Sequence, residues 1–170
     1  VRSGRWTGWS PTQLLGTEIS GKTLGVIGLG RIGQAVAQRA MGFRMQVRYH
    51  TSHPQATSTF PPEWEYRSLQ DLLGEADIVT IHVPLTPHTH HLIGARELAW
   101  MKRTTLVINT ARGPIIDEGA LVNALKTGVI AGAGLDVYEQ EPAIHSALAE
   151  LKQVLLLPHI GSATLQARTQ

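Results

Sequence analysis

Short apolar segments alternate with amphipathic segments along most of the chain. Runs rich in Val, Ile and Leu, short enough for buried strands, are separated by stretches with apolar residues at helical spacing. The expected strands are 23–27, 45–49, 77–83, 105–109, 130–136 and 154–157. The expected helices are 32–41, 69–75, 96–102 and 117–127, and a further helix is expected to open within 163–170. Strands and helices that alternate in this way form a parallel sheet with crossover helices.

Six such strands predict an α/β fold. We expect a Rossmann-type, doubly wound parallel sheet in three layers, forming a single domain over residues 1–170. The irregular lead at 4–16 carries Trp6 and Trp9, and it either docks on a partner subunit as an arm or covers the domain's own apolar face. Irregular segments at 51–62, 84–91 and 138–148 each follow the carboxyl end of a strand. Open α/β sheets bind ligands at that edge, so these segments are expected to be binding loops.

The composition excludes several classes of protein. Fifteen Lys and Arg against 13 Asp and Glu give a net charge of only +2, which disfavours nucleic-acid binding. The absence of cysteine excludes disulfides, iron–sulfur clusters and thiolate zinc sites, and fits a cytoplasmic location. No apolar stretch approaches the ~20 residues that span a bilayer, so no membrane partner is expected.

Two further features suggest that the chain is part of a larger protein. Charged residues make up 16% of the sequence, whereas about 25% is typical, as expected if another domain or subunit covers some of the surface. The chain also begins at Val1 rather than Met and ends within an expected helix. We therefore interpret the sequence as a fragment.

A glycine-rich loop follows the first expected strand directly. Gly28, Gly30 and Gly33 form the pattern G-x-G-x-x-G between a strand and a helix, which is the context that dinucleotide binding requires. Gly28 allows the tight turn, Gly30 a close approach of the pyrophosphate, and Gly33 close helix packing. The helix N-terminus attracts phosphate, and Arg31 could add a contact. The alternative is a glycine turn that serves packing alone.

The end of the second expected strand bears on the choice of cofactor. The acidic residue that usually holds a ribose 2′-hydroxyl is missing, and the chain runs through His50, Thr51 and Ser52 instead. These side chains, with Arg48 or His53 nearby, could hydrogen-bond a 2′-phosphate. The sequence therefore favours NADP over NAD, although a polar loop that tolerates either cofactor is the alternative.

Three side chains are candidates for catalysis. Arg112 follows the fourth strand, where its guanidinium could bind a carboxylate; the alternative is a surface salt bridge. His159 follows the last strand and is suited to exchange a proton near neutral pH. Either Glu141 or Glu139 could orient the imidazole, and spacing does not distinguish them.

The remaining histidines are assigned no chemistry. His88, His90 and His91 share one loop, but no carboxylate or cysteine accompanies them at a recognised ligand spacing, so no metal site is expected. His82 lies within an apolar strand and is interpreted as a packed residue.

Five motifs together resemble the D-isomer-specific 2-hydroxyacid dehydrogenases, most closely the glyoxylate/hydroxypyruvate reductase branch with its 2-ketogluconate reductases. The resemblance covers almost the whole chain and rests on the glycine loop at 28–33, Val-Pro-Leu-Thr at 83–86, Asn-Thr-Ala-Arg-Gly at 109–113, Gly-Leu-Asp-Val-Tyr at 134–138 with Glu-Pro at 141–142, and Pro-His-Ile-Gly-Ser-Ala-Thr at 158–164. It implies that Arg112 binds a 2-oxo acid, that His159 is the acid/base and that Glu141 is its partner. In that family an Asp often ends the second strand, where this chain has His50.

The resemblance also implies where the cofactor lies. Arg31 and Ile32 would meet the pyrophosphate, and Val83 and Pro84 would lie by the adenosine half. Thr110, Asp136 and Gly161 would lie near the nicotinamide end. The full cofactor-binding set that we expect is Gly28, Gly30, Arg31, Ile32, Gly33, His50, Thr51, Ser52, Val83, Pro84, Thr110, Ala111, Arg112, Asp136, His159 and Gly161.

The resulting hypothesis is an enzyme that reduces a short 2-oxo acid, glyoxylate or hydroxypyruvate first, with NADPH favoured over NADH. The family's substrate-binding domain, built from segments before and after the cofactor domain, is absent from residues 1–170, so the isolated chain is expected to be inactive. The family and the two Trp residues favour a homodimer. The alternatives are a cofactor-sensing corepressor of the same fold and, last, a nucleotide-dependent methyltransferase, which would leave Arg112, Glu141 and His159 unexplained.

Overall fold

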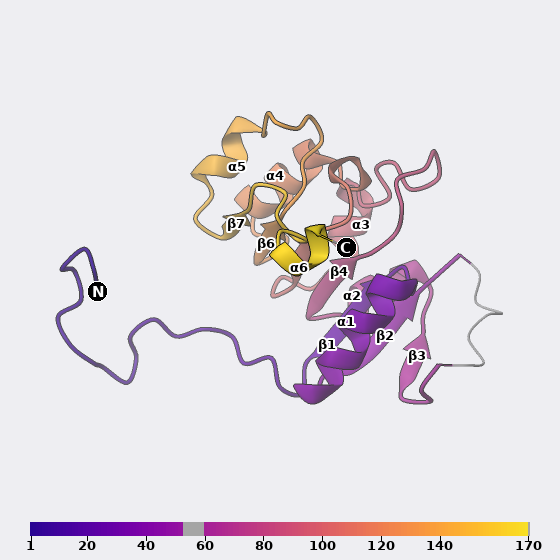
Figure 1. Cartoon of the computed structure of the whole chain (residues 1–170), viewed down its shortest axis with the longest axis horizontal. Coiled ribbons are helices and arrows are strands. Elements are labelled where there is room, and N and C mark those ends of the chain that lie inside the picture. The colour runs from indigo at the N-terminus through magenta and orange to yellow at the C-terminus, as the bar shows by residue number, and fades with distance from the viewer. Residues whose placement is uncertain (53–59, 170) are drawn as a thin grey trace.

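The computed structural model describes residues 1–52 and 60–169, and within them seven parallel strands form one sheet (Figure 1). The strands are β1 (Thr23–Ile27), β2 (Gln46–His50), β3 (Trp64–Tyr66), β4 (Ile78–Ile81), β5 (Leu106–Asn109), β6 (Gly132–Leu135) and β7 (Val154–Leu156). Their order is β3-β2-β1-β4-β5-β6-β7, and every neighbouring pair is parallel. The strand order reverses beside β1, as in a doubly wound sheet, so the predicted fold class is confirmed.

Helices cover both faces of the sheet and complete the three layers. They are α1 (Arg31–Gly42), α2 (Leu69–Glu75), α3 (Ala95–Trp100), α4 (Glu118–Lys126), α5 (Ser146–Glu150) and α6 (Leu165–Arg168). Two apolar cores result, and β1 contributes to both because successive strand residues point to opposite faces. Val26 packs with Ala37 of α1, whereas Ile27 belongs to the larger core with Leu72 of α2 and Leu121 of α4.

The structure corrects the sequence-based elements at three places. The expected six strands omitted β3, which pairs with β2 at the sheet edge. The segment 138–148 was expected to be irregular throughout, but α5 begins at Ser146, where the His145 ring accepts a hydrogen bond from the Ala147 N–H at 3.3 Å. A short 3₁₀ helix at Gly113–Ile115 was also not expected. The remaining expected strands and helices are present, with ends that differ by one or two residues.

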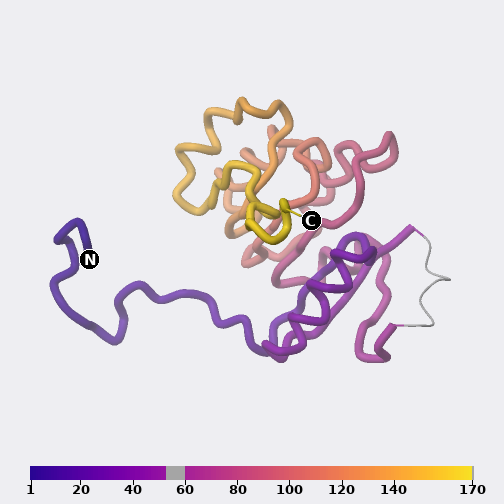
Figure 2. The backbone as a smooth tube through the Cα atoms, in the orientation of Figure 1, coloured from indigo at the N-terminus to yellow at the C-terminus, as the bar shows by residue number. Residues whose placement is uncertain are grey.

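The N-terminal lead extends away from the rest of the chain (Figure 2). Trp6 and Trp9 are 53% and 83% exposed to solvent, and Leu14 and Leu15 are exposed as well. The two Trp residues therefore do not cover the domain's own apolar face, which was one of the two interpretations of this segment. Among the described residues, no helix is long and apolar enough to cross a membrane.

Candidate active site

The turn between β1 and α1 is built of glycines that leave no room for side chains. Gly28 has φ +92°, and a Cβ there would lie 2.8 Å from the His82 carbonyl oxygen and 2.7 Å from Val83 Cγ1. A Cβ on Gly33 would lie 2.1 Å from the Gly28 carbonyl oxygen. Gly30, in contrast, faces open space, and no described side chain caps the N–H groups that begin α1 after it. The turn therefore offers free donors to an anionic group.

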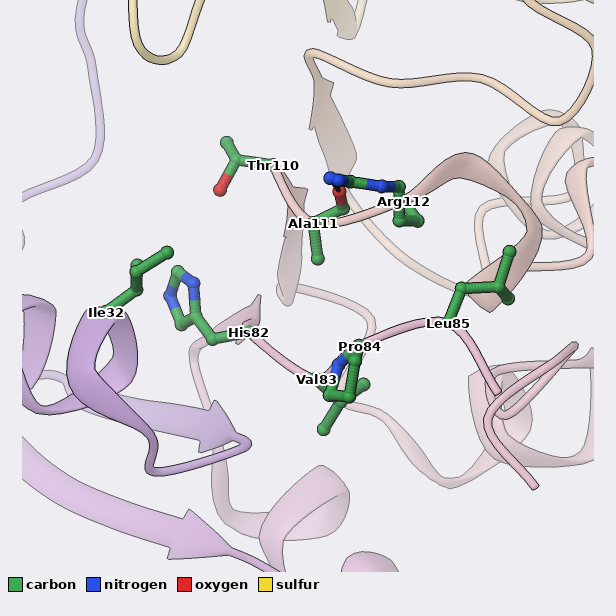
Figure 3. A pocket seen from close by; sticks show the side chains of 8 residues that line it. All are labelled: Ile32, His82, Val83, Pro84, Leu85, Thr110, Ala111 and Arg112. Atoms are coloured by element: carbon green, nitrogen blue, oxygen red, sulfur yellow. Dashed lines mark hydrogen bonds between the residues drawn. The ribbon is translucent and has the colours of Figure 1, made fainter. Parts of the chain in front are cut away.

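Two adjoining cavities lie along the carboxyl edge of the sheet. The first has a volume of about 480 Å³ and is lined by Ile32, His82, Val83, Pro84, Leu85, Thr110, Ala111 and Arg112 (Figure 3). The second has about 570 Å³ and is lined by Ile27, Gly28, Leu29, Gly30, His50, Thr51, Ser52, His82, Val83, Pro84, Thr86, His88, Thr89 and Leu92. His82, Val83 and Pro84 line both, so an extended ligand can pass from one cavity to the other.

His50 enters the second cavity with one ring nitrogen already engaged. Its Nδ1 lies 3.1 Å from the Arg67 carbonyl oxygen, which can only accept, so Nδ1 carries a proton. Nε2 is thereby left as the nitrogen for a ligand. Thr51 and Ser52 line the same cavity, whereas His53 lies outside the described residues.

Arg48, which the sequence suggested as a possible ligand of a 2′-phosphate, is paired with carboxylates. Its guanidinium pairs with Glu65 at 2.9 Å and with Glu75 at 3.3 Å, and it does not line the second cavity. Arg31 also lines neither cavity but lies with Arg39 along α1. Among the residues expected to bind a phosphate, the structure thus brings His50, Thr51 and Ser52 to the second cavity and leaves these two cations outside its lining.

Arg112 stands at the end of β5 on a turn that Asn109 holds. Asn109 is almost fully buried; its Nδ2 donates to the Arg112 carbonyl oxygen at 2.9 Å, and its Oδ1 accepts from the Ala111 N–H at 3.0 Å. The Arg112 side chain itself is exposed at the rim of the first cavity, where it can reach a ligand carboxylate (Figure 3). Asn109 was overlooked as a supporting residue, although an Asn at the end of a strand often forms such a turn.

His159 pairs with Glu141. The two atoms in contact are Nδ1 of the ring and Oε2 of the carboxylate, 2.8 Å apart. This hydrogen bond is the main cause that lowers the pKa of Glu141; the Tyr138 N–H and the charge of Arg112 act in the same direction, against burial. Glu141 is therefore an ionised acceptor at neutral pH, so Nδ1 carries a proton and Nε2 is free to exchange one.

Glu139, the other candidate partner of the imidazole, is engaged elsewhere. Its carboxylate contacts the His91 ring and accepts from the Glu118 N–H at 3.4 Å, while its own N–H donates to Glu118 Oε1 at 2.8 Å. The structure therefore places Glu141 rather than Glu139 against His159. The His90 and His91 rings lie 4.0 Å apart, and within the described part of the chain no three His, Cys, Asp or Glu side chains are grouped to hold a metal ion.

Tyr138 connects the three segments that carry the candidate side chains. Its N–H donates to Glu141 Oε1 at 3.0 Å, and its hydroxyl donates to the Leu157 carbonyl oxygen at 2.7 Å, two residues before His159. Its own carbonyl group packs so closely on Gly113 that a Cβ there would lie 1.9 Å away. One buried residue thus fixes the ends of β5, β6 and β7 relative to each other.

Asp136 contacts the turn that carries His159. It is 3% exposed, and its two oxygens accept from the N–H groups of Ile160 at 2.8 Å and of Gly161 at 2.6 Å. The sequence suggested Asp136 and Gly161 only as cofactor contacts, because a backbone contact between distant segments leaves no pattern in the sequence.

Residues 1–161 match the family model for the D-isomer specific 2-hydroxyacid dehydrogenase, NAD binding domain. The chain belongs to this family. The glyoxylate reductase of Thermococcus litoralis is 51% identical over 99% of the chain and 52% of its own length. A solved structure from Thermus thermophilus is 46% identical, with a TM-score of 0.89 over 98% of this chain and 52% of that one. The glyoxylate reductase structure from Paecilomyes thermophila is 42% identical, with a TM-score of 0.87 over 99% and 50%.

As a 2-hydroxyacid dehydrogenase domain, the chain is of a kind that binds a nicotinamide cofactor, which agrees with the glycine turn and the two adjoining cavities. Relatives named as reductases support the enzyme interpretation over the corepressor alternative. The chain spans about half the length of the relatives that it matches.

Proposed function

We propose that this chain is the cofactor-binding part of a 2-oxo acid reductase, with glyoxylate and hydroxypyruvate as the first candidate substrates. The observation that carries the proposal is the contact between His159 and Glu141, at the sheet edge where Arg112 borders the first cavity. A proton donor and a carboxylate-binding guanidinium at the same edge of the sheet are what reduction of a 2-oxo acid requires. The names of the relatives, glyoxylate reductases from Thermococcus litoralis and Paecilomyes thermophila, support this substrate class.

The residues present fit a dinucleotide. The open space at Gly30 and the uncapped start of α1 suit a diphosphate, and the two adjoining cavities beside this turn suit the two halves of the dinucleotide. A bound nicotinamide supplies the hydride for the keto carbon.

The chain's own residues supply binding and the proton. Arg112 binds the substrate carboxylate and fixes the carbonyl group beside His159. As the carbonyl oxygen gains negative charge, His159 Nε2 gives it a proton, and the imidazole is left neutral until solvent returns one. Glu141 keeps the other ring nitrogen protonated and stabilises the cationic ring before the transfer.

Turnover assays on the whole protein test these roles. His159→Ala should lower kcat by about 10²- to 10⁴-fold while cofactor affinity stays nearly unchanged. Arg112→Lys, which keeps the charge but loses the two-pronged guanidinium, should mainly raise KM for the 2-oxo acid. The matched control is His145→Ala, because His145 is exposed, lines neither cavity and bonds the start of α5. Full turnover of the His159 variant would remove this residue from the mechanism.

For the cofactor, the proposal is NADPH in preference to NADH. No carboxylate stands at His50, Thr51 or Ser52 to repel a 2′-phosphate, and His50 Nε2 is the nitrogen left for it. Solved relatives hold either cofactor: an acyclic imino acid reductase is in complex with NADPH, and a Lactobacillus delbrueckii dehydrogenase is in its NAD form. Calorimetric titration of the chain with each cofactor decides between them. His50→Asp should reverse the preference, and tighter NADH binding by the unaltered chain would contradict it.

The proposal extends to a homodimer in the cytoplasm. The exposed Trp6 and Trp9 on the extended lead offer apolar surface to a second copy of the chain. Sedimentation of the chain should therefore show a dimer, and replacing both Trp residues by Ala should shift it towards monomer. A monomeric unaltered chain would argue against this part of the proposal.

A further inference from the structure

His159 occupies a backbone conformation that its side chain disfavours. Its φ is +56°, in the left-handed region, where a Cβ crowds the neighbouring carbonyl oxygen. Such a conformation persists only where surrounding contacts hold it, and such residues cluster at functional sites. The turn at 159–161 therefore needs an anchor outside itself.

Asp136 supplies the contacts that this anchor requires. The two N–H groups that follow His159, those of Ile160 and Gly161, both point to its carboxylate, at 2.8 Å and 2.6 Å. The carboxylate belongs to a residue that is 3% exposed and directly follows β6, which pairs with β5 on one side and β7 on the other. A Cβ on Gly161 would lie 2.9 Å from Asp136 Oδ2, so the turn approaches the carboxylate too closely for a larger residue at that position.

Resting on the proposed function, we propose that Asp136 is a positioning residue for the proton donor: it holds His159 in the left-handed turn that directs the ring to both Glu141 and the substrate. Only a carboxylate accepts on both oxygens. An Asn at 136 would turn one of the two acceptors into a donor facing an N–H group. The turn would then relax, and the contact between His159 Nδ1 and Glu141 Oε2 would be lost with it.

The segment after β6 that contains Asp136 also positions Glu141, the partner of His159. Tyr138, two residues after Asp136, donates its N–H to Glu141 Oε1 at 3.0 Å. Asp136 thus sets the backbone of the histidine, and Tyr138 sets the carboxylate that the histidine meets. Both oxygens of Asp136 keep a second lone pair, which leaves a cofactor contact compatible with the positioning role, so the test must separate the two.

A double-mutant cycle in the whole protein makes that separation. Asp136→Asn should lower kcat, measured at saturating cofactor, at least tenfold when His159 is present. In a His159→Ala background the same substitution should change the residual kcat less than twofold. Equal fold losses in both backgrounds would show that Asp136 acts without His159 and would overturn the proposal.

A matched carboxylate controls for the loss of a backbone contact in general. Asp77 accepts from the Thr23 N–H at 2.9 Å and from Lys102 Nζ at 3.1 Å, near the opposite edge of the sheet. Asp77→Asn should leave kcat unchanged within twofold. Gly161→Ala disturbs the same contact, because its added Cβ would crowd Asp136 Oδ2. It should therefore lower kcat only when His159 is present, and it replaces Asp136→Asn in the cycle if that variant does not fold.

Amide hydrogen exchange tests the anchor without any turnover. In the 170-residue chain, Asp136→Asn should speed exchange at the Ile160 and Gly161 N–H groups at least tenfold, with little change in β1. Unchanged exchange at both groups would overturn the proposal. A wild-type protein that reduces no 2-oxo acid would refute the proposed function, and the exchange result would still decide whether Asp136 holds the turn.

Discussion

Adding one methyl group to Gly33 should damage both the stability of the chain and its cofactor site. The new Cβ would lie 2.1 Å from the Gly28 carbonyl oxygen and 3.3 Å from Val26 Cγ1, whereas ordinary contacts begin near 3.4 Å. The glycine turn or α1 must therefore move by more than 1 Å. Overpacking of this kind costs roughly 1–3 kcal/mol. At about 2–4 °C per kcal/mol for a domain of this size, Tm should fall by roughly 2–12 °C.

Thermal unfolding and calorimetric titration with NADPH and NADH measure the two effects of Gly33→Ala. Because the displaced turn no longer presents the first N–H groups of α1, affinity should fall at least tenfold for both cofactors. Gly42→Ala is the matched control: Gly42 ends the same helix with no atom within 4 Å of an added Cβ, so this change should be neutral or gain about 0.4–1 kcal/mol. If Gly33→Ala bound the cofactors as tightly as the unaltered chain, close packing at Gly33 would not shape the site.

Two further variants test the site and the core. Since the hydrogen bond from His159 lowers the pKa of Glu141, turnover should persist below the ordinary range of a glutamic acid and fall only as that carboxylate gains a proton. Glu141→Gln should remove this acid limb and lower kcat about 10- to 100-fold; an unchanged pH profile would contradict the pairing. The fully buried Thr105 hydroxyl donates to the Ala76 carbonyl oxygen at 2.9 Å, so Thr105→Val should cost about 1–3 kcal/mol in urea unfolding. The exposed neighbour is the control: Thr104→Val should stay within about 0.5 kcal/mol, and an equal loss there would contradict the buried bond.

The sequence was informative about the sheet because buried parallel strands are nearly continuous apolar runs. The edge strand β3 was not predicted because it has only three residues, Trp-Glu-Tyr, of which Trp64 alone is buried. So short a segment cannot show a period. The glycine turn was predictable for the opposite reason, since its spacing is local and its context is a strand followed by a helix.

The contacts within the candidate site were harder to predict from the sequence. Glu141 and His159 are 18 residues apart, and from the residues alone Glu139 was an equal candidate. What separates the two is the direction of the backbone after β6, which turns Glu139 towards Glu118 and His91. The ion pairs of Arg48 depend likewise on β3 and α2, so the sequence could not show that this residue is paired with Glu65 and Glu75.

The position of Tyr138 limits how this site can change during evolution or by design. Because one residue contacts the Glu141 carboxylate, the strand before His159 and the turn after Arg112, an insertion or deletion beside it would displace all three side chains at once. The loop after β6 is therefore a poor place to alter the candidate site. Leu85, which lines the first cavity and takes no part in the Tyr138 contacts, can vary in size while His159, Glu141 and Arg112 keep their mutual geometry. We therefore expect the lining of the first cavity to vary more readily than the arrangement of these three side chains.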